Sequence, residues 1–349
     1  MPGTPSSDPR ERGTIETFAS LAALPADATP LFAVSSTFFS TRPWWEIVLA
    51  RAIPSGAVPR LVLVRVDGEA VALFPMLAGD DFRALTTPYT CLYEPLIVAA
   101  RDAAFAAFAR YCRSFSTVRL DAFDEAAEAG IAAAARESGL FVVRFDHFGN
   151  WYEDIAGLDW AGYLARRPGA LRETIRRRTR RAERLTNASF RLFDGLDDLA
   201  TGIEAFETIY ARSWKDPEPF PGINPAQIRA AAELGIARLG VWWIDGVPAA
   251  AQFWIMEHGQ ATVLKLAHDE AFKAHSPGTV VTAWMIRHMI EREHAVMLDF
   301  GRGDDPYKQD WVSSRRQRIG LMLINPRRLG GMIALARHAM GRVRARLRP

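Results

Sequence analysis

Cysteine is almost missing from this chain, which has only Cys91 and Cys112 among its 349 residues. Two cysteines cannot build a disulfide framework or a cysteine-rich metal site, and such scarcity is typical of proteins that fold in a reducing compartment. No run of about 18 apolar residues is long enough to span a membrane. Residues 1–12 lack the apolar core of a signal peptide. We therefore expect a cytoplasmic protein, soluble or peripheral at the inner face of the membrane.

The motifs of several large enzyme classes are also missing. The sequence contains no G-x-x-x-x-G-K-[ST] phosphate loop, no G-x-G-x-x-G fingerprint and no H-E-x-x-H zinc motif. Nucleotide hydrolysis, dinucleotide redox chemistry and zinc hydrolysis therefore have no support in the sequence. The composition, with 49% hydrophobic and 24% charged residues, predicts an ordinary globular protein. The length fits two domains of about 150 residues each.

A net charge of +3 conceals two arginine-rich segments. Residues 166–184 hold nine arginines and two glutamates, and residues 315–349 hold ten arginines and no acid. The first segment predicts a solvated helix rather than a nucleic-acid site, because aromatic residues for base stacking are absent from it; tRNA stays as the alternative partner. The tail, residues 326–349, predicts a basic amphipathic helix that either lies on an anionic membrane or packs on its own domain.

Two predicted hairpins occupy similar places in the two halves of the chain. Residues 60–66 and 69–77 flank Asp67-Gly68, and residues 237–244 and 248–257 flank Asp245-Gly246. Asp-Gly between two apolar runs predicts a tight turn joining antiparallel strands. This repetition favours an internal duplication of one α/β unit, with coincidence as the alternative.

The most informative stretch, residues 294–311, is a short apolar strand that ends among glycine, acidic, tyrosine and lysine residues. A carboxylate at such a strand end could accept a proton from an attacking amine or hydroxyl, and a tyrosine could protonate a leaving thiolate. We therefore predict Asp299 and Tyr307 as catalytic residues. The alternative is that Asp299 accepts a backbone hydrogen bond and Tyr307 only packs.

A second candidate site precedes the helix predicted for residues 280–293. Free backbone N–H groups and the positive end of the helix dipole bind phosphate at such a position. The predicted cofactor-binding residues are His275, Ser276, Gly278, Thr279 and Lys308, the last as a point charge. The alternative is that Ser276 and Thr279 only cap the helix.

The predicted substrate-binding residues surround these two segments. They are Trp214, Gln252, Lys265, Arg302 and Asp304. Arg302 suits a carboxylate or phosphate as a bidentate fork, while large aromatic residues such as Trp214 more often build the core. Lys265 and His268 point to opposite faces of their strand, so we do not expect them to serve one site.

Several motifs taken together resemble one enzyme superfamily. They are Lys265-Leu266-Ala267-His268-Asp269, His275-Ser276-Pro277-Gly278-Thr279, Asp299-Phe300-Gly301-Arg302-Gly303-Asp304, Tyr307-Lys308 and Trp311. In this order they resemble the end of the catalytic domain of GNAT acyltransferases, and within them the cellulose-biosynthesis acetyltransferase-like branch related to Fem-type aminoacyltransferases. The resemblance covers roughly residues 155–325.

The resemblance implies an α/β fold of tandem GNAT-like lobes, each a mixed, mainly antiparallel sheet flanked by helices. We expect a flexible N-terminus (1–30), an N-terminal lobe (31–154), a catalytic lobe (155–325) and the basic tail (326–349). The implied reaction moves an acyl group, by preference acetyl, from acyl-CoA to an amine or hydroxyl in envelope polysaccharide synthesis, without a metal. The alternatives are an aminoacyl-tRNA donor and a non-catalytic scaffold at the membrane.

Overall fold

The computed structural model describes residues 13–79 and 81–346 of the chain. The chain forms two units: unit 1 takes Met1–Phe148 and Gln317–Pro349, and unit 2 takes Gly149–Arg316. These units differ from the predicted lobes because strands β7 (Phe141–Asp154) and β13 (Ser314–Ile324) each begin in one unit and end in the other.

The flexible N-terminus predicted for residues 1–30 lies partly outside the described residues. From Gly13 onward the chain is ordered: β1 (Gly13–Phe18) pairs antiparallel with β2 (Val58–Val66), and 3-10 turns follow at Leu21–Ala23 and Ala26–Val34. The alternation of Ile15 with polar neighbours lets this short strand bury one face on unit 1.

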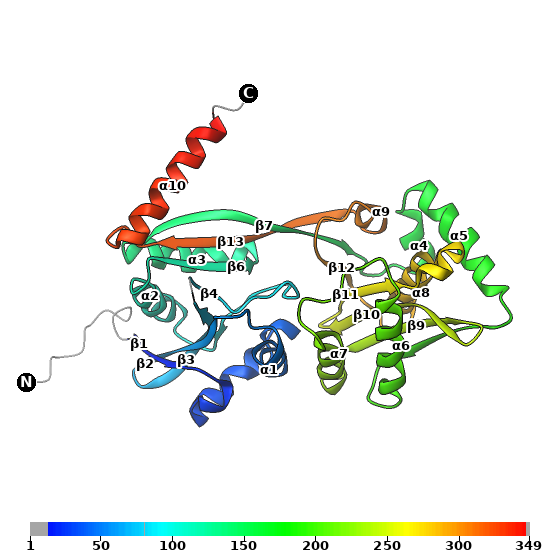
Figure 1. Cartoon of the computed structure of the whole chain (residues 1–349), viewed down its shortest axis with the longest axis horizontal. Coiled ribbons are helices and arrows are strands. Elements are labelled where there is room, and N and C mark those ends of the chain that lie inside the picture. Colours follow the sequence, from blue (N-terminus) through cyan, green and yellow to red (C-terminus); the bar gives the residue numbers. More distant parts are fainter. Residues whose placement is uncertain (1–12, 80, 347–349) are drawn as a thin grey trace, which may run out of the picture. The chain divides into compact units, whose positions relative to one another are not determined.

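Unit 1 is a mixed sheet with helices against it (Figure 1). Its remaining strands are β3 (Glu69–Ala78), β4 (Phe82–Ala84), β5 (Leu96–Ile97) and β6 (Thr117–Phe123). Its helices are α1 (Arg42–Arg51), α2 (Arg101–Cys112), α3 (Glu125–Glu137) and α10 (Leu329–Arg346), with a 3-10 turn at Phe38–Ser40. The strand order is β1-β2-β3-β4-β6-β13, and β5 pairs with β3.

Unit 2 repeats this plan with its own elements. Its strands are β8 (Ala188–Phe193), β9 (Ala237–Ile244), β10 (Val247–Glu257), β11 (Gln260–His268) and β12 (Met297–Arg302), with the end of β7. Its helices are α4 (Trp160–Ala165), α5 (Gly169–Glu183), α6 (Leu199–Ala211), α7 (Ile223–Glu233), α8 (Pro277–Glu291) and α9 (Lys308–Trp311), with a 3-10 turn at Glu270–His275. The strand order is β8-β9-β10-β11-β12-β7.

The same sequence of pairings runs through both units. Four antiparallel strands, β1 to β4 or β8 to β11, are followed by one parallel neighbour, β6 or β12, and then by one antiparallel strand, β13 or β7. Both predicted Asp-Gly hairpins join the second and third strands of their unit, and all four turn residues have positive φ. The structure therefore confirms the duplication and the α/β fold class of tandem GNAT-like lobes.

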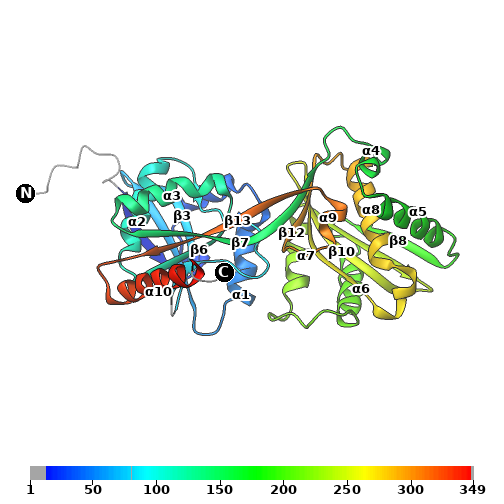
Figure 2. The same ribbon diagram turned by 90° about the horizontal axis from the view of Figure 1, so that it is seen from above.

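The sheet of unit 2 lies between two helix layers (Figure 2). Helix α8 and its neighbour α5 cover one face, and α6 with α7 covers the other. Apolar residues of α8 pack with Trp242 and Trp254 of the sheet in one continuous buried cluster. This packing sets the start of α8 against the strands that carry the predicted site.

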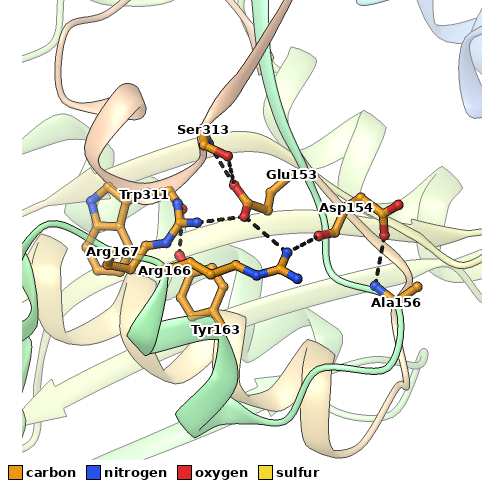
Figure 3. Close-up of polar contacts among 8 residues, drawn as sticks. All are labelled: Glu153, Asp154, Ala156, Tyr163, Arg166, Arg167, Trp311 and Ser313. Carbon is orange, nitrogen blue, oxygen red and sulfur yellow. Dashed lines mark hydrogen bonds and ion pairs between the residues drawn. The ribbon is translucent and has the colours of Figure 1, made fainter.

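One buried ion pair ties the margins of unit 2 together (Figure 3). The Arg167 guanidinium donates to Glu153 Oε1 at 2.6 Å, and the two side chains are 1% and 4% exposed. Glu153 Oε2 accepts from the backbone N–H and hydroxyl of Ser313 at 2.7 and 2.6 Å. Arg167 and the Tyr163 hydroxyl also donate to the Trp311 carbonyl. The network joins α4, β7, α9 and the start of β13.

Burial raises the pKa of the Glu153 carboxyl, but hydrogen bonds from Ser313 and Arg167 outweigh burial, so the pKa lies below its usual value. Glu153→Gln is expected to lower the free energy of unfolding by about 3 kcal/mol, because Arg167 would stay buried without a countercharge. Urea unfolding at pH 7 measures this loss.

Because the folded pKa of Glu153 is depressed, its contribution is present above the unfolded value of about 4.3 and disappears as the pH falls through the folded pKa. The gap between wild type and Glu153→Gln should therefore close in acid. Glu173→Gln is the control, since it breaks the exposed Glu173–Arg176 pair and should leave the unfolding midpoint unchanged. An equal loss in both variants would contradict the prediction.

Candidate functional site

The parallel strands β11 and β12 pair only over their first three residues. The pairs are Gln260 with Met297, Ala261 with Leu298 and Thr262 with Asp299. Beyond them β11 follows β10, with a bulge that leaves Leu264 unmatched, and β12 follows β7. Their facing backbone edges are therefore not paired with each other toward their carboxyl ends, where ligands commonly bind in open α/β sheets.

Three segments far apart in the sequence meet at these carboxyl ends. They are the loop 212–222 after α6, the segment 269–276 before α8 and the loop 303–307 after β12. Arg212 lies 3.6 Å from Asp269, and the Glu270 N–H donates to the Arg212 carbonyl. Burial and the Lys265 ammonium lower the pKa of Lys215, and the charges of Asp305 and Lys308 also act on it. The three loops therefore border one polar region.

The start of α8 presents uncapped backbone N–H groups to this region. Ser276 is the N-cap residue with φ of 54°, and its side chain caps no N–H of the helix. The capping alternative therefore fails for Ser276, and the N–H groups of Gly278 and Thr279 are available to a phosphate. His275 Nδ1 is shielded from solvent and has no hydrogen-bond partner among the residues that the structure describes.

Gln252 on β10 is linked to the start of α8 by hydrogen bonds through Thr282. Its side chain is 2% exposed and donates to Thr282 Oγ1 at 2.5 Å, while its carbonyl accepts from Trp254 Nε1 at 2.8 Å. Thr282 in turn donates to the Gly278 carbonyl. We predicted that the Gln252 amide binds substrate. In the structure its polar atoms are engaged in this chain of hydrogen bonds, so Gln252 fixes α8 on β10.

Four polar residues form a second group, which we call the Glu218 cluster: Tyr210, Lys215, Glu218 and Lys265. Glu218 Oε1 accepts from the Tyr210 hydroxyl at 2.6 Å and from the Lys265 ammonium. The Lys215 ammonium lies 5.9 Å from the Tyr210 ring. Burial and the hydrogen bond to Glu218 raise the pKa of Tyr210, so its phenol stays protonated at neutral pH.

Trp214 and His268 extend the same region. Trp214 is 52% exposed, and its ring centre lies 4.4 Å from that of His268. Burial lowers the pKa of His268 more than Glu270 raises it. Although Lys265 and His268 point to opposite faces of β11, both contact the loop 212–222, which wraps the strand end. The two residues therefore border the same loop, and their assignment to different sites stays a prediction.

Asp299 lies inside the fold of unit 2. It is 3% exposed, and its Oδ1 accepts from Asn150 Nδ2 and from the Gly301 N–H, both at 2.7 Å. Its Oδ2 pairs with the Arg316 guanidinium. These are the backbone and structural contacts of the alternative interpretation; the catalytic role remains a prediction.

Tyr307 and Lys308 differ in exposure and in the polar contacts of their side chains. Tyr307 is 41% exposed as a residue, yet burial of its hydroxyl raises its pKa. The buried Lys308 ammonium donates to the carbonyls of Arg302 and Gly303 at 2.8 and 3.2 Å and pairs with Asp305. Its three donors hold the glycine loop in shape, so a phosphate would have to displace one of these partners.

Asp304 braces the same loop against neighbouring strands, whereas Arg302 ends β12 opposite Asn150. The Asp304 carboxylate accepts from Trp151 Nε1 and from Arg315 Nε, both at 2.8 Å, and hydrogen bonds from Arg315 lower its pKa. A Cβ at Gly149 would lie 2.4 Å from this carboxylate, so a larger residue there would have to displace the Asp304 side chain. Asp304 thus already has cationic and indole partners.

Sequence reasoning missed Tyr210 and Glu218. Tyr210 lies near the end of an apolar helix and Glu218 in a proline-rich loop, and no motif connects them to Lys265. The one available signal was Glu218 itself, an acidic residue in the loop between helices α6 and α7. Within the described residues no group of three His, Cys, Asp or Glu residues could hold a metal ion.

Comparison with known families identifies unit 2. The family model for the acetyltransferase (GNAT) domain matches residues 169–309. This part of the chain is therefore similar to a GNAT domain, which indicates an acyltransferase. A search of curated proteins found no match.

Solved structures support the fold over nearly the whole chain. FemX superposes with a TM-score of 0.57 at 12% identity, covering 89% of this chain and 98% of its own. The C-terminal domain of a proposed lysylphosphatidylglycerol synthetase from Agrobacterium fabrum gives 0.57 at 10% identity, with coverages of 88% and 94%. A conserved protein from Bacteroides thetaiotaomicron gives 0.55 at 10% identity, with coverages of 89% and 100%. Similarity at these identities concerns the fold.

Asp299→Asn is expected to lower the free energy of unfolding by about 2 kcal/mol, because Arg316 would lose its carboxylate partner in a largely buried setting. Chemical unfolding monitored by tryptophan fluorescence measures this. Asp304→Asn, at a far more exposed carboxylate, is the matched control and should change stability much less. Unchanged stability in Asp299→Asn together with lost acyl transfer would instead support the catalytic role.

Proposed function

We propose that unit 2 transfers an acyl group from an acyl-CoA donor to an amine or hydroxyl acceptor. The observation that carries this proposal is the parting of β11 and β12 beside the uncapped start of α8. An extended donor can add its pantetheine amides to unpaired strand edges, while its pyrophosphate meets free backbone N–H groups. The GNAT match over the same residues supports this placement.

The donor would be held by the segment before α8. The N–H groups of Gly278 and Thr279 and the unpartnered His275 would receive the pyrophosphate, with Ser276 bringing the backbone into position. The donor's thioester would then point toward the carboxyl ends of β11 and β12.

The acceptor would bind on the side of the Glu218 cluster. Glu218 shares its carboxylate between Tyr210 and Lys265, so an incoming amine or hydroxyl can replace one of these donors and lose its proton there. The exposed Trp214 ring offers a flat apolar surface for a sugar or similar acceptor. Arg302 at the end of β12 supplies a cation for an acidic group on the acceptor.

In the proposed reaction the acceptor attacks the thioester carbonyl directly, the C–S bond breaks, and the leaving thiolate takes a proton. Tyr307 suits this last step because its raised pKa keeps the phenol protonated at working pH. The site supplies positioning, which accounts for much of the rate in such transfers. We place the reaction in envelope polysaccharide synthesis, as the resemblance to the cellulose-biosynthesis acetyltransferase-like branch implies.

An aminoacyl-tRNA donor is the second candidate. The favouring observation is α5, which packs beside α8, buries Ile175 and Ala182, and leaves Arg172, Arg177 and Arg180 exposed. The FemX and lysylphosphatidylglycerol synthetase folds are compatible with a donor of this kind. Tight tRNA binding that weakens steeply with salt would favour this candidate.

The donor site is tested by titrating the purified protein with acetyl-CoA in a thermal-shift assay. Ligand at about 100 times its Kd should stabilise the protein by about 2.7 kcal/mol and raise the unfolding midpoint by several degrees. Gly278→Asp should abolish this shift, because a carboxylate would occupy the place of the phosphate. An acid in the first turn suits the helix dipole, so the variant should remain folded.

Gly278→Ala is the matched control. An added Cβ meets only His268 Nδ1, at an ordinary 3.7 Å, so donor binding should persist. The absence of a shift with any acyl-CoA in the wild-type protein would reject the CoA donor and direct the same assay to aminoacyl-tRNA. If both donors fail, the catalytically silent scaffold remains.

Tyr307→Phe is expected to lower kcat roughly a hundredfold while leaving the thermal shift by donor intact, because it removes a proton donor and not a binding group. Release of free thiol from acyl-CoA measures the rate. Since the pKa of Tyr307 is raised above its usual value of about 10, the wild-type rate should not fall between pH 7 and 9.5 through this group. A variant with full activity would remove Tyr307 from the mechanism.

A further inference from the structure

Helix α10 (Leu329–Arg346), the red helix in Figure 1, is fixed to unit 1 through its first turn. Asn325 donates to the Arg113 carbonyl at 2.7 Å, and its own Oδ1 accepts from the Arg327 N–H at 3.0 Å. A Cβ at Gly331 would lie 1.9 Å from the Asn325 carbonyl oxygen, so the helix approaches this loop as closely as only glycine allows. The start of α10 is therefore firmly placed on unit 1.

The side of α10 that faces unit 1 and the opposite side differ in what they expose. Gly331, Leu335 and His338 face the unit, and the His338 ring lies 6.3 Å from that of Phe141. The opposite side carries Leu329, Met332, Ile333, Ala336 and Met340, which fall within about 100° of the helix circumference. We call these five residues the α10 stripe.

The α10 stripe is open to solvent. Leu329 is 71% exposed, Met332 50%, Ile333 46% and Met340 55%, and Ala336 is exposed as well. Large apolar side chains that share one exposed face indicate a surface that another body covers. Packing of the basic tail on its own domain, the alternative to membrane binding, therefore explains only the side of α10 that faces unit 1.

The charges around the α10 stripe identify the occupant. Arg327, Arg328 and Arg337 are exposed near it, and residues 326–349 contain seven arginines and no acid. An apolar stripe with exposed arginines beside it complements a surface with an apolar interior and an anionic rim, which is an anionic bilayer. Among the described residues, no helix has the length and hydropathy needed to cross a bilayer.

We propose that α10 lies flat on an anionic membrane, with the α10 stripe among the acyl chains and its arginines at the lipid phosphates. This docking places unit 1 against the bilayer by the Asn325 junction and is independent of the acyl-transfer chemistry of unit 2. A second copy of the chain suits the stripe less well, because a dimer through this face would bring the exposed Arg327, Arg328 and Arg337 of each copy together.

The test is sedimentation of the full chain with vesicles of 30% phosphatidylglycerol in phosphatidylcholine, compared with pure phosphatidylcholine. We expect binding to the anionic vesicles that weakens with salt. The double variant Met332→Asp, Met340→Asp should lower the partition coefficient at least tenfold, and Arg337→Gln should lower it roughly fivefold. Both variants change exposed residues, so their unfolding midpoints should match the wild type.

Leu196→Asp is the matched control, because Leu196 is 61% exposed but lies in unit 2. It should bind vesicles as the wild type does. No binding to anionic vesicles at low salt, or equal binding by the double variant, would overturn the proposal. A concentration-dependent dimer that the double variant abolishes, without vesicle binding, would overturn it in favour of a second copy.

Discussion

The buried pair between Arg167 and Glu153 is the interaction on which unit 2 depends. Two charges that are almost fully excluded from water stay there only because Ser313 and the Trp311 carbonyl complete their hydrogen bonds (Figure 3). The pair sets α4 and the start of α5 against β7, and sets α9 beside them. The loop after β12 ends in α9, so this pair also limits where Tyr307 can lie.

The site follows from a second constraint, the early end of pairing between β11 and β12. A bulge at Leu264 shifts the register of β11 on β10, and beyond their first three pairs the two parallel strands follow different partners. Their carboxyl ends become the meeting point for the loop after α6, the segment before α8 and the loop after β12. In the proposed function, the donor and the acceptor approach this meeting point from opposite sides of one sheet.

The parts of the fold that the sequence predicted are those set by patterns among neighbouring residues. The Asp-Gly hairpins, helix α8 and the arginine-rich helix α5 are all present, because turn chemistry and apolar spacing act over a few neighbouring residues. The exchange of β7 and β13 between units was not predictable. Ser314 to Arg318 is basic and lacks strand alternation, and the rest of β13, from Ile319 to Ile324, pairs with β6, almost two hundred positions earlier. The boundary between the units, after Phe148, falls inside the long strand β7, where no loop or linker marks it in the sequence.

The sequence by itself determined the duplicated α/β plan, the helix start near Ser276 and the basic tail, because each rests on neighbouring residues. The tertiary structure alone decided how polar atoms are used. It paired Asp299 with Arg316, occupied Lys308 with two carbonyls, and joined Glu218 to Lys265 and Tyr210. A hydrogen bond depends on distance in space, and residues on different elements, such as Glu218 and Lys265, become neighbours only once the fold has formed.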